Sequence, residues 1–553
     1  MISCNDNKSQ NNYQTENQIE NQTEIFTDIA TEVGLDFVHV NGMDGNLYYP
    51  EIMGPAVALF DFDNDDDLDV FIGQGGALNK NDKQDETTMG RLYRNELDKG
   101  QLGFTDVTSE SGLTATGYSI GVATGDVNND GFVDLFVTNF GPNQLFINQG
   151  NGVFQDMTQV SGITGDQFSS SAAFVDYNGD NLLDLYVVNY LEYSLGENKF
   201  CANEAGARDY CGPNSYPGAE DQLFKNLGNG IFENYSSKSG IDIAGNGLGV
   251  VSADFNADGK IDLYVTNDMA HNFMWMNQGE DKFVDEALLR GNAVNNHGKP
   301  EASMGVDTGD LDNDGDYDLF MTHLLNETNT TYINDGNGYF ADETAALGMA
   351  NPSFGHTGFG TAFLDYDNDG WLDVVIMNGA VRRIQKQVDL GLDFPLNQRN
   401  QLIRNNEGRF IEVSSQAPVL SIENVSRGAA VGDIDNDGDI DVLISNTNGN
   451  VQLLQNNMGQ DNQWLGVKLI DETGKFLLGS VATLTLGNGK KMMRRSRTDA
   501  SYVSANDPRI VYGLGKDSSV KKIEVKWFDG QVSSHDSLIL NQYNEIIHNG
   551  KVR

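Results

Sequence analysis

The stretch DIDNDGDID, Asp433 to Asp441, places a carboxylate at positions one, three, five, seven and nine, with Gly438 at position six. Carboxylates this close together repel each other by roughly 1 kcal/mol per pair in water, and by more where the surroundings are less polar. The loop therefore needs a cation. The pattern favours calcium, which accepts six to eight oxygen ligands in flexible geometry, over magnesium, which requires a near-ideal octahedron.

An EF-hand loop begins with the same spacing, but it closes with a glutamate at position twelve and continues into a helix. In three of the acidic loops of this chain, position twelve is apolar: Val137, Met321 and Ile444. The closing acid is at position nine, and β-branched or aromatic residues follow it, as is typical of strands. The sequence therefore predicts calcium loops between strands.

Seven copies of the acidic loop occur about 50 to 80 residues apart, a spacing that indicates a repeat array and up to seven calcium ions. In the first and third copies, Asp66 and Asn181 replace the glycine at position six, which makes calcium affinity there less certain. At positions one, three, five and nine the predicted ligands are Asp61, Asp63, Asp65 and Asp69; Asp126, Asn128, Asp130 and Asp134; Asp176, Asn178, Asp180 and Asp184; Asp254, Asn256, Asp258 and Asp262; Asp310, Asp312, Asp314 and Asp318; Asp365, Asp367, Asp369 and Asp373; and Asp433, Asp435, Asp437 and Asp441.

Each repeat unit reads as four strands. A strand of small residues precedes the acidic loop, an apolar strand follows it, a third strand ends in Asn, and a fourth segment begins with Phe, as in FTDVT at Phe104. The seventh unit lacks this fourth segment, whereas FTDIA at Phe26 precedes the first unit. The pattern predicts an all-β fold: a seven-bladed β-propeller closed by an N-terminal strand, which leaves no open sheet edge.

The repeats end near residue 460, and the composition changes there. Residues 461–553 contain 14 Lys and Arg against 10 Asp and Glu, a net charge of +4 within a chain of −46, so the rest carries −50. We therefore predict a polar tether at 1–24, the propeller at 25–460 and a small β domain at 461–553. Hydrophobic residues make up 39% of the 553 residues, enough for a sizeable core. The sequence contains no run of eighteen apolar residues, the length that a membrane-spanning helix needs.

Several motifs resemble the cartilage acidic protein family, which combines integrin-type FG-GAP or VCBS-like repeats with an ASPIC/UnbV domain. They are YYPEIMGPAVALFDFDNDDDLD, YCGPNSYPGAEDQLFKNLGNG, NETNTTYINDGNGYFADET and YVSANDPRIVYGLG. The resemblance extends from Phe26 to the C-terminus. It implies an extracytoplasmic, calcium-binding propeller of the kind found in integrin α chains.

The chain contains three cysteines. Cys201 and Cys211 flank a short loop, and in an exported protein such a pair is more often a disulfide than a metal site. Cys4 follows Ile2 and Ser3 in a manner that resembles the end of a bacterial lipoprotein signal. Lipidation of Cys4 would anchor the protein to a membrane, such as the outer membrane; the alternatives are a free cysteine in a polar tail and a secreted protein.

Strand order predicts two unlike faces. All acidic loops join first to second strands and so share one face, while the long insertions, 75–90, 191–220, 291–303 and 380–400, lie on the other. Loops of this length are usually functional or disordered, so we expect the ligand to bind on the insertion face. His39 also maps there, as do four histidines in the connections of neighbouring blades, namely His271, His297, His323 and His356. These either collect in loops as polar residues do, or provide the base of a lyase or hydrolase.

The basic cluster Lys490, Lys491, Arg494, Arg495 and Arg497 could suggest nucleic-acid binding, but the net charge of −46 opposes it. We expect instead a solvated strand face, or docking of the small domain on the acidic propeller. The sequence favours a surface or extracellular adhesion or ligand-capture module that binds a protein or glycan, with no catalytic residues assigned. The alternative is an enzyme acting on acidic polysaccharide. Ligand identity and oligomeric state do not follow from the sequence.

Overall fold

The computed structural model describes residues 24–78, 88–516, 519–548 and 550–553. Its regular structure is almost entirely β-strand, in agreement with the predicted all-β class. The α-helices are short: α1 (Thr108–Ser111), α2 (Ser236–Ser239), α3 (Ala287–Arg290), α4 (Thr344–Leu347), α5 (Ala350–Ser353) and α6 (Gln385–Asp389). Cys4 and most of the predicted tether lie outside the described residues.

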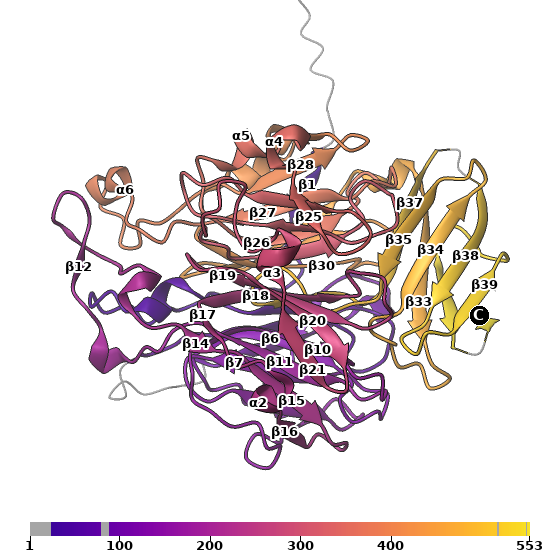
Figure 1. The fold of residues 1–553 in the computed structure, drawn as a ribbon, viewed down its shortest axis with the longest axis horizontal. Coiled ribbons are helices and arrows are strands. Elements are labelled where there is room, and N and C mark those ends of the chain that lie inside the picture. Colours follow the sequence, from indigo (N-terminus) through magenta and orange to yellow (C-terminus); the bar gives the residue numbers. More distant parts are fainter. Residues whose placement is uncertain (1–23, 79–87, 517–518, 549) are drawn as a thin grey trace, which may run out of the picture.

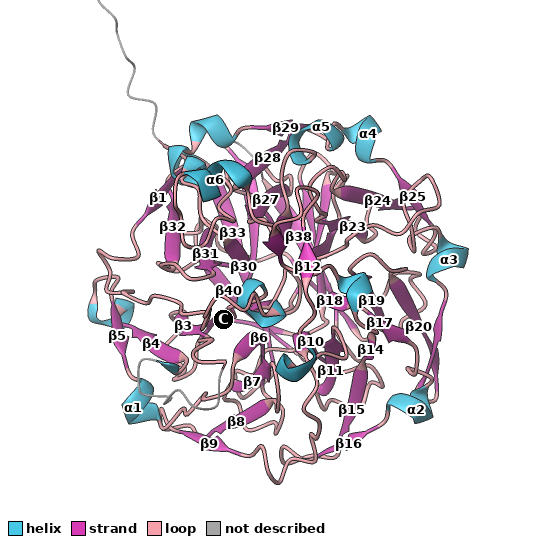
Figure 2. Ribbon diagram, turned by 90° about the vertical axis from the view of Figure 1, so that its left-hand side faces the viewer, coloured by secondary structure: helices cyan, strands magenta, loops and turns pink. Residues whose placement is uncertain are grey.

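Each acidic loop joins the first two of four antiparallel strands in a sheet, the first sheet having a fifth, parallel strand, and these sheets are arranged around a common centre in a propeller-like manner (Figure 2). In sheet order they are β2 (Val57–Phe60), β3 (Asp69–Ile72), β4 (Arg91–Asn95) and β5 (Phe104–Asp106); β6 (Ser119–Gly125), β7 (Asp134–Asn139), β8 (Gln144–Asn148) and β9 (Phe154–Asp156); β10 (Ser169–Val175), β11 (Asp184–Asn189), β15 (Gln222–Asn226) and β16 (Phe232–Asn234); β18 (Gly247–Ala253), β19 (Asp262–Asn267), β20 (Phe273–Gly279) and β21 (Lys282–Asp285); β22 (Val306–Gly309), β23 (Asp318–Met321), β24 (Thr330–Asn334) and β25 (Phe340–Asp342); β26 (Gly358–Leu364), β27 (Asp373–Asn378), β28 (Gln401–Asn405) and β29 (Phe410–Glu412); and β30 (Ser426–Gly432), β31 (Asp441–Asn446), β32 (Gln452–Asn456) and β1 (Phe26–Asp28).

Strand β1 joins the sheet that contains the last acidic loop. It pairs antiparallel with β32, placing Phe26 opposite Asn456, which is the neighbour that the repeat pattern predicts. The first and last sheets also share a hydrophobic cluster, in which Val57 and Leu59 of β2 contribute together with Ala430 of β30 and Leu443 of β31. Sheets at the two ends of the repeat array therefore pack against each other.

The aspartate at position nine of each acidic loop fixes the loop to its sheet. In every copy its carboxylate accepts a hydrogen bond from the backbone N–H of the Asn at or near the end of the third strand, as Asp441 does from Asn456 at 2.8 Å. In all copies except the third, it also accepts the N–H of the position-two residue. Charge-assisted hydrogen bonds of this kind are stronger than neutral ones.

The same Asn residues bridge neighbouring sheets. Each donates its side-chain amide to the backbone carbonyl of the position-two residue in an adjacent acidic loop. The pairs are Asn95 with Ile434, Asn148 with Phe62, Asn226 with Val127, Asn277 with Tyr177, Asn334 with Phe255, Asn405 with Leu311 and Asn456 with Tyr366, at 2.7 to 3.1 Å.

Residues beyond the repeats form two four-stranded sheets that pack around one hydrophobic cluster, seen at the right of Figure 1. One contains β37 (Ile510–Gly515), β33 (Gln463–Ile470), β40 (Tyr543–Ile547) and β41 (Lys551–Val552); the other contains β35 (Lys491–Arg495), β34 (Val481–Leu486), β38 (Val520–Lys526) and β39 (Val532–His535). We call them the C-terminal sheets.

Residues 498–506, the central loop, leave the C-terminal sheets and enter the middle of the propeller-like assembly. Within this loop β36 (Ser504–Ala505) pairs in parallel with β2. Six further contacts reach the first strand of each of the other sheets. They join Thr498 to Thr124, Val503 to Ser171, Asp499 to Ser252, Ser501 to Val306 and to Thr361, and Asn506 to Val431.

The bridging role of the Asn residues can be tested in Asn226, which is 2% exposed and donates to the carbonyls of Val127 and Leu183, both at 2.8 Å. The change Asn226→Ala should lower the free energy of unfolding by about 1 to 3 kcal/mol, because it leaves buried carbonyls without a donor. Urea denaturation measures this. The exposed Gln155→Ala is the control, and an equal effect of the two changes would contradict the bridging role.

Candidate functional site

The acidic loops share one tight backbone conformation. In all loops but the fifth, the position-one carboxylate accepts the N–H groups of positions five and six; in the last loop, Asp433 accepts those of Asp437 at 3.0 Å and Gly438 at 2.9 Å. Position six has a positive φ, 90° at Gly438. Asp66 and Asn181, which replace this glycine, adopt φ values of 71° and 67°. Asp and Asn tolerate the left-handed region better than most residues, so both loops retain the turn.

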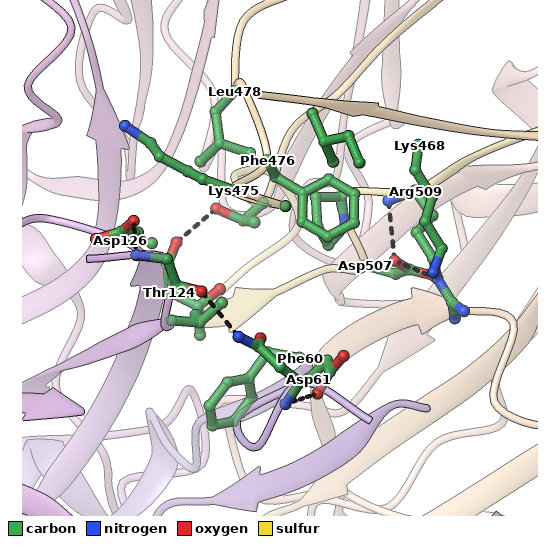
Figure 3. A pocket seen from close by; sticks show the side chains of 18 of the residues that line it. Phe60, Asp61, Thr124, Asp126, Lys468, Lys475, Phe476, Leu478, Asp507 and Arg509 are labelled. Carbon is green, nitrogen blue, oxygen red and sulfur yellow. Dashed lines mark hydrogen bonds and ion pairs between the residues drawn. The ribbon is translucent and has the colours of Figure 1, made fainter. Parts of the chain in front are cut away.

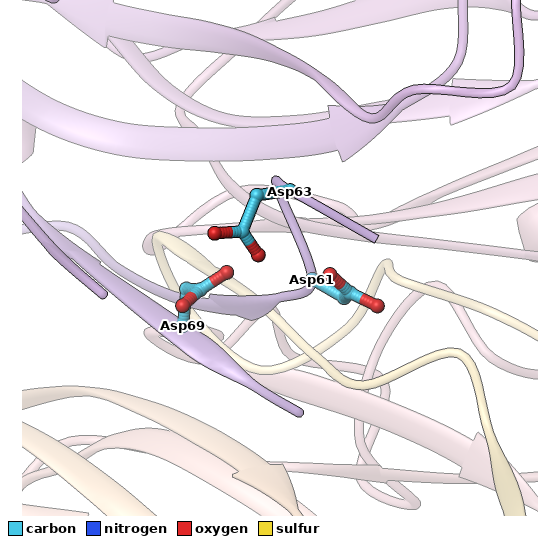
Figure 4. Close-up of side chains that lie close together, drawn as sticks. All are labelled: Asp61, Asp63 and Asp69. Atoms are coloured by element: carbon cyan, nitrogen blue, oxygen red, sulfur yellow. The ribbon is translucent and has the colours of Figure 1, made fainter. Parts of the chain in front are cut away.

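Four acidic loops gather three of their predicted ligands closely enough to hold one metal ion. The carboxylate oxygens of each group lie within 4.8 Å of one another, and Figure 4 shows the group of the first loop. The groups are Asp61, Asp63 and Asp69; Asp310, Asp312 and Asp314; Asp365, Asp367 and Asp373; and Asp433, Asp435 and Asp441.

These loops also contain buried carboxylate oxygens that lack a hydrogen-bond partner within the described part of the chain. They are Oδ1 of Asp63, Asp67, Asp310, Asp316, Asp367 and Asp435, and Oδ2 of Asp439. A buried, unpartnered carboxylate oxygen is costly unless a cation neutralises it. Several all-oxygen ligands around one point are the donor set of a hard divalent cation, so the residues present fit such an ion.

The second, third and fourth loops differ. Asn occupies position three in each, and the described structure does not gather three carboxylates in them to the same distance. In the fourth loop, two carboxylates form ion pairs with lysines: Lys526 lies 3.1 Å from Asp254, and Lys260 lies 2.5 Å from Asp258. The seven predicted sites are thus not equivalent.

The structure contains one further group of three carboxylates that the sequence pattern did not predict. Asp98, in the turn Leu97–Lys99 after β4, joins Asp65 and Asp67 of the first loop in a further group of three carboxylates. The backbone N–H of Asp98 donates to Asp67 at 3.1 Å. Asp98 lies outside the nine-residue pattern, so only the folding of β4 against β3 brings it to the loop.

Burial and mutual repulsion raise the pKa values of the loop carboxyls. Desolvation is the larger cause, and neighbouring carboxylates add to it. The pKa is raised to about 7 for Asp365 and Asp433 and to about 8 for Asp439. The ionised form that a metal requires is therefore unfavourable in the metal-free fold, and a bound cation would reverse this.

The pKa shifts predict how the stability of the metal-free protein depends on pH. Folded-state pKa values near 7 lie above those of unfolded aspartates, near 4, so the folded state binds protons more tightly. This stabilisation is complete below about pH 4 and is lost as pH rises to about 7. Melting temperatures of metal-depleted protein should fall over that window, whereas added divalent cation should abolish the fall. A metal-free melting temperature that rises with pH would contradict the shifts.

The C-terminal sheets cover the face that carries the acidic loops. Tyr543 donates its hydroxyl to Asp433 Oδ2 at 2.8 Å, and Arg509 donates to the Asp433 carbonyl at 2.6 Å. Lys468 pairs with Asp66, and Lys475 donates to Asn129. The positive C-terminal sheets thus dock directly on the acidic loops.

Part of the basic cluster contributes to this docking. Arg497 lies 2.7 Å from Asp307 of β22, and Arg495 donates to the Ser252 hydroxyl at 3.0 Å. Lys490 lies over the ring of Trp371 in the sixth loop, at 4.5 Å. Lys491 is exposed. We expected either a solvated strand face or docking of the small domain on the repeats, and the contacts of Arg497, Arg495 and Lys490 are docking contacts.

A cavity of about 250 Å³ lies where the C-terminal sheets meet the first two acidic loops (Figure 3). Its walls include Phe60, Phe476 and Leu478, and its cations already have protein partners. Arg509 pairs with Asp507 at 2.8 Å, in addition to the lysine contacts with Asp66 and Asn129. The cavity therefore belongs to the docked interface.

The insertions 191–220 and 380–400 lie on the opposite side from the C-terminal sheets, near β12 (Cys201–Ala202) and α6 in Figure 1. Cys201 and Cys211 form a disulfide, as the sequence predicts. Buried aromatic residues pack beneath the insertions, and Tyr49, Tyr190 and Tyr210 belong to the same cluster as Tyr502 of the central loop. The insertions are therefore packed on the core.

The histidines of the predicted ligand face do not form a uniform set. His271 and His297 are exposed, and His356 is half-buried. His323 is buried, and burial lowers its pKa to about 4, so it stays neutral at pH 7. No group of three potential metal ligands found among the described residues contains a histidine. His39 is a core residue whose Nδ1 accepts the Asn448 N–H at 3.0 Å.

Two known sequence families match parts of this chain. FG-GAP-like repeats match residues 61–137, 126–187, 254–321 and 310–376, and a segment described as ASPIC and UnbV matches residues 471–553. None of the helices in the described part of the chain has the length and apolar character that a membrane crossing needs.

Curated relatives confirm the predicted family resemblance. Cartilage acidic protein 1 of Homo sapiens is 26% identical over 325 residues, covering 57% of this chain and 46% of that protein. The Mus musculus protein is 27% identical over 320 residues, covering 56% and 46%. The matched region is thus about half the length of these relatives.

Solved structures give more distant likenesses. An Agrocybe aegerita lectin that recognises non-reducing terminal N-acetylglucosamine is 14% identical, with a TM-score of 0.39, over 73% of this chain and 96% of that one. The rhamnogalacturonan lyase YesW is 13% identical, with a TM-score of 0.37, over 73% and 72%. Likeness at this level carries no information about ligands.

Proposed function

We propose that this chain is a calcium-stabilised ligand-binding module. The proposal is supported by its similarity to cartilage acidic protein 1, by its FG-GAP-like repeats and by its ASPIC and UnbV segment. Its architecture would be a seven-bladed β-propeller closed by β1. Its ligand would be a protein or glycan outside the cytoplasm, held on the insertion face.

The observation that carries this proposal is the different state of the two faces. The C-terminal sheets occupy the acidic-loop face, where Tyr543, Arg509 and Lys526 contact loop residues. The insertion face has no comparable cover among the described residues; its insertion 191–220 contains a disulfide, and buried aromatic residues pack beneath the insertions. A rigid, uncovered surface of loops is the usual place for ligand binding.

Calcium is the ion that best suits the acidic loops. Four loops gather three carboxylates each, and their unpartnered oxygens call for a cation with many oxygen ligands. The Cys201–Cys211 disulfide supports a location outside the reducing cytoplasm. A membrane anchor at Cys4 stays a prediction, as do the absence of nucleic-acid binding and the partner class.

Calcium dependence can be tested at position three of the last loop. The change Asp435→Asn gives this loop the pattern of the second, third and fourth loops and removes one negative charge, so it should weaken calcium binding at this loop and reduce the stabilisation by calcium. Elemental analysis and melting temperatures with calcium and with chelator measure this. The exposed Asp242→Asn is the matched control. An unchanged melt in chelator, together with no bound calcium, would overturn the calcium assignment.

Binding can be distinguished from catalysis on the insertion face. Glycan arrays and pull-downs with the full chain should show capture, and no turnover of acidic polysaccharide. Replacing His271, His297, His323 and His356 together by Gln should leave capture intact, since none of the metal-ligand groups among the described residues includes a histidine. Turnover by the parent that this variant loses would make the enzyme the better description.

A further inference from the structure

A second cleft lies on the insertion face, beneath the two longest insertions. It measures about 340 Å³, at the small end of the range for ligand pockets. Three distant segments line it: Met43 to Glu51 before β2, Arg208 and Tyr210 of the disulfide insertion, and Arg383 with Asp393 to Pro395 of the insertion after β27. This inference rests on the proposed function and specifies its ligand.

Two arginines line this cleft without a carboxylate partner. Arg208 donates only to backbone carbonyls, those of Gly45 at 3.3 Å and Asn46 at 2.6 Å. The guanidinium of Arg383 makes neither a hydrogen bond nor an ion pair with any described residue, although its backbone N–H donates to Asp209 at 3.2 Å. Both guanidinium groups therefore keep the capacity to bind an anion.

Such arginines stand out in a chain with a net charge of −46. Most of the other arginines pair with an acid at 2.7 to 3.0 Å, among them Arg94, Arg290, Arg399, Arg404, Arg495, Arg497 and Arg509. Arg399 belongs to the same insertion as Arg383 and still pairs with Glu412. The protein is rich in acidic residues, so a shortage of them does not explain why Arg208 and Arg383 have no carboxylate partner.

The acids of the cleft leave these guanidinium groups available. Glu51 is fully buried, and its carboxylate already accepts the Tyr48 N–H at 2.9 Å and the Tyr210 hydroxyl at 2.7 Å. Asp393 is exposed, and the structure shows no ion pair between it and either arginine. The remaining walls are apolar, with Met43, Leu47, Phe394 and Pro395.

We propose that this cleft binds an acidic sugar residue of a polysaccharide. Arginine presents a planar fork of donors that matches a carboxylate, which would lie against Arg383 and Arg208. The apolar face of the sugar ring would pack against Leu47 and Phe394. One sugar unit presents both features within the width of a small cleft, and its flanking units would extend over the exposed insertions.

The test uses the full chain in calcium and two matched ligands. One is an oligogalacturonate, and the other is the same oligosaccharide with its carboxylates reduced to alcohols. The parent should bind the acidic form about tenfold to a hundredfold more tightly, as expected for charge-assisted hydrogen bonds. Arg383→Gln should remove most of this preference, and Arg208→Gln with Arg383→Gln should remove all of it. The paired Arg399→Gln should bind as the parent does.

The outcomes separate this inference from the proposed function. Arg383→Gln keeps the assay valid if Arg208→Gln disturbs the fold, because the Arg383 guanidinium makes no polar contact with the described residues. Failure of the parent to prefer the acidic form, or an acid preference that survives both changes, would overturn the acidic-sugar site. Capture of a neutral glycan, an acidic peptide or a protein by parent and variants alike would do so too, while leaving a ligand-binding module in place.

Discussion

The position-nine aspartate is the group on which the rest of the structure depends. Its carboxylate receives backbone N–H groups from the third strand and, in most copies, from the start of its own loop, so one side chain fixes strand, loop and sheet together. The adjacent Asn then extends the connection to the next sheet, as Asn456 does to Tyr366. Because these contacts recur along the repeats, with the contact to the position-two N–H missing only in the third, local loop geometry and the packing of neighbouring sheets are set by the same residues.

This arrangement concentrates charge on one face, and the protein compensates for it in two ways. Four loops offer carboxylates that suit a divalent cation, and some of their buried oxygens have no other partner among the described residues. The fourth loop instead receives lysine amines, and the second lies next to Lys475. The C-terminal sheets, with a net charge opposite to that of the repeats, add Arg509 and Tyr543 at the last loop. Asp433 thus belongs both to a group of carboxylates that suits a cation and to the interface with the C-terminal sheets.

The central loop gives the C-terminal segment a structural role beyond covering a face. It contacts the first strand of every sheet around the centre, from Thr124 of β6 to Val431 of β30. Its Tyr502 reaches through to the carbonyl of Met53 and joins the aromatic cluster beneath the insertions. A single segment thus joins the C-terminal sheets to the aromatic cluster on the opposite side of the assembly.

Local rules acting on the sequence were sufficient for the repeats. The nine-residue spacing specifies the acidic turns, and even Asp66 and Asn181 keep the positive φ of the glycine they replace. Strand order follows from alternating apolar runs, and the place of β1 follows from the one missing segment.

The contacts that only tertiary structure decided join residues with no fixed spacing. Asp98 reaches the first loop through strand pairing, and Tyr502 enters the centre from the segment that follows the repeats. Arg208 and Arg383 line the same cleft although they belong to insertions far apart in the sequence. Pairing rules based on periodicity cannot predict such meetings, because they arise from how whole sheets and insertions pack.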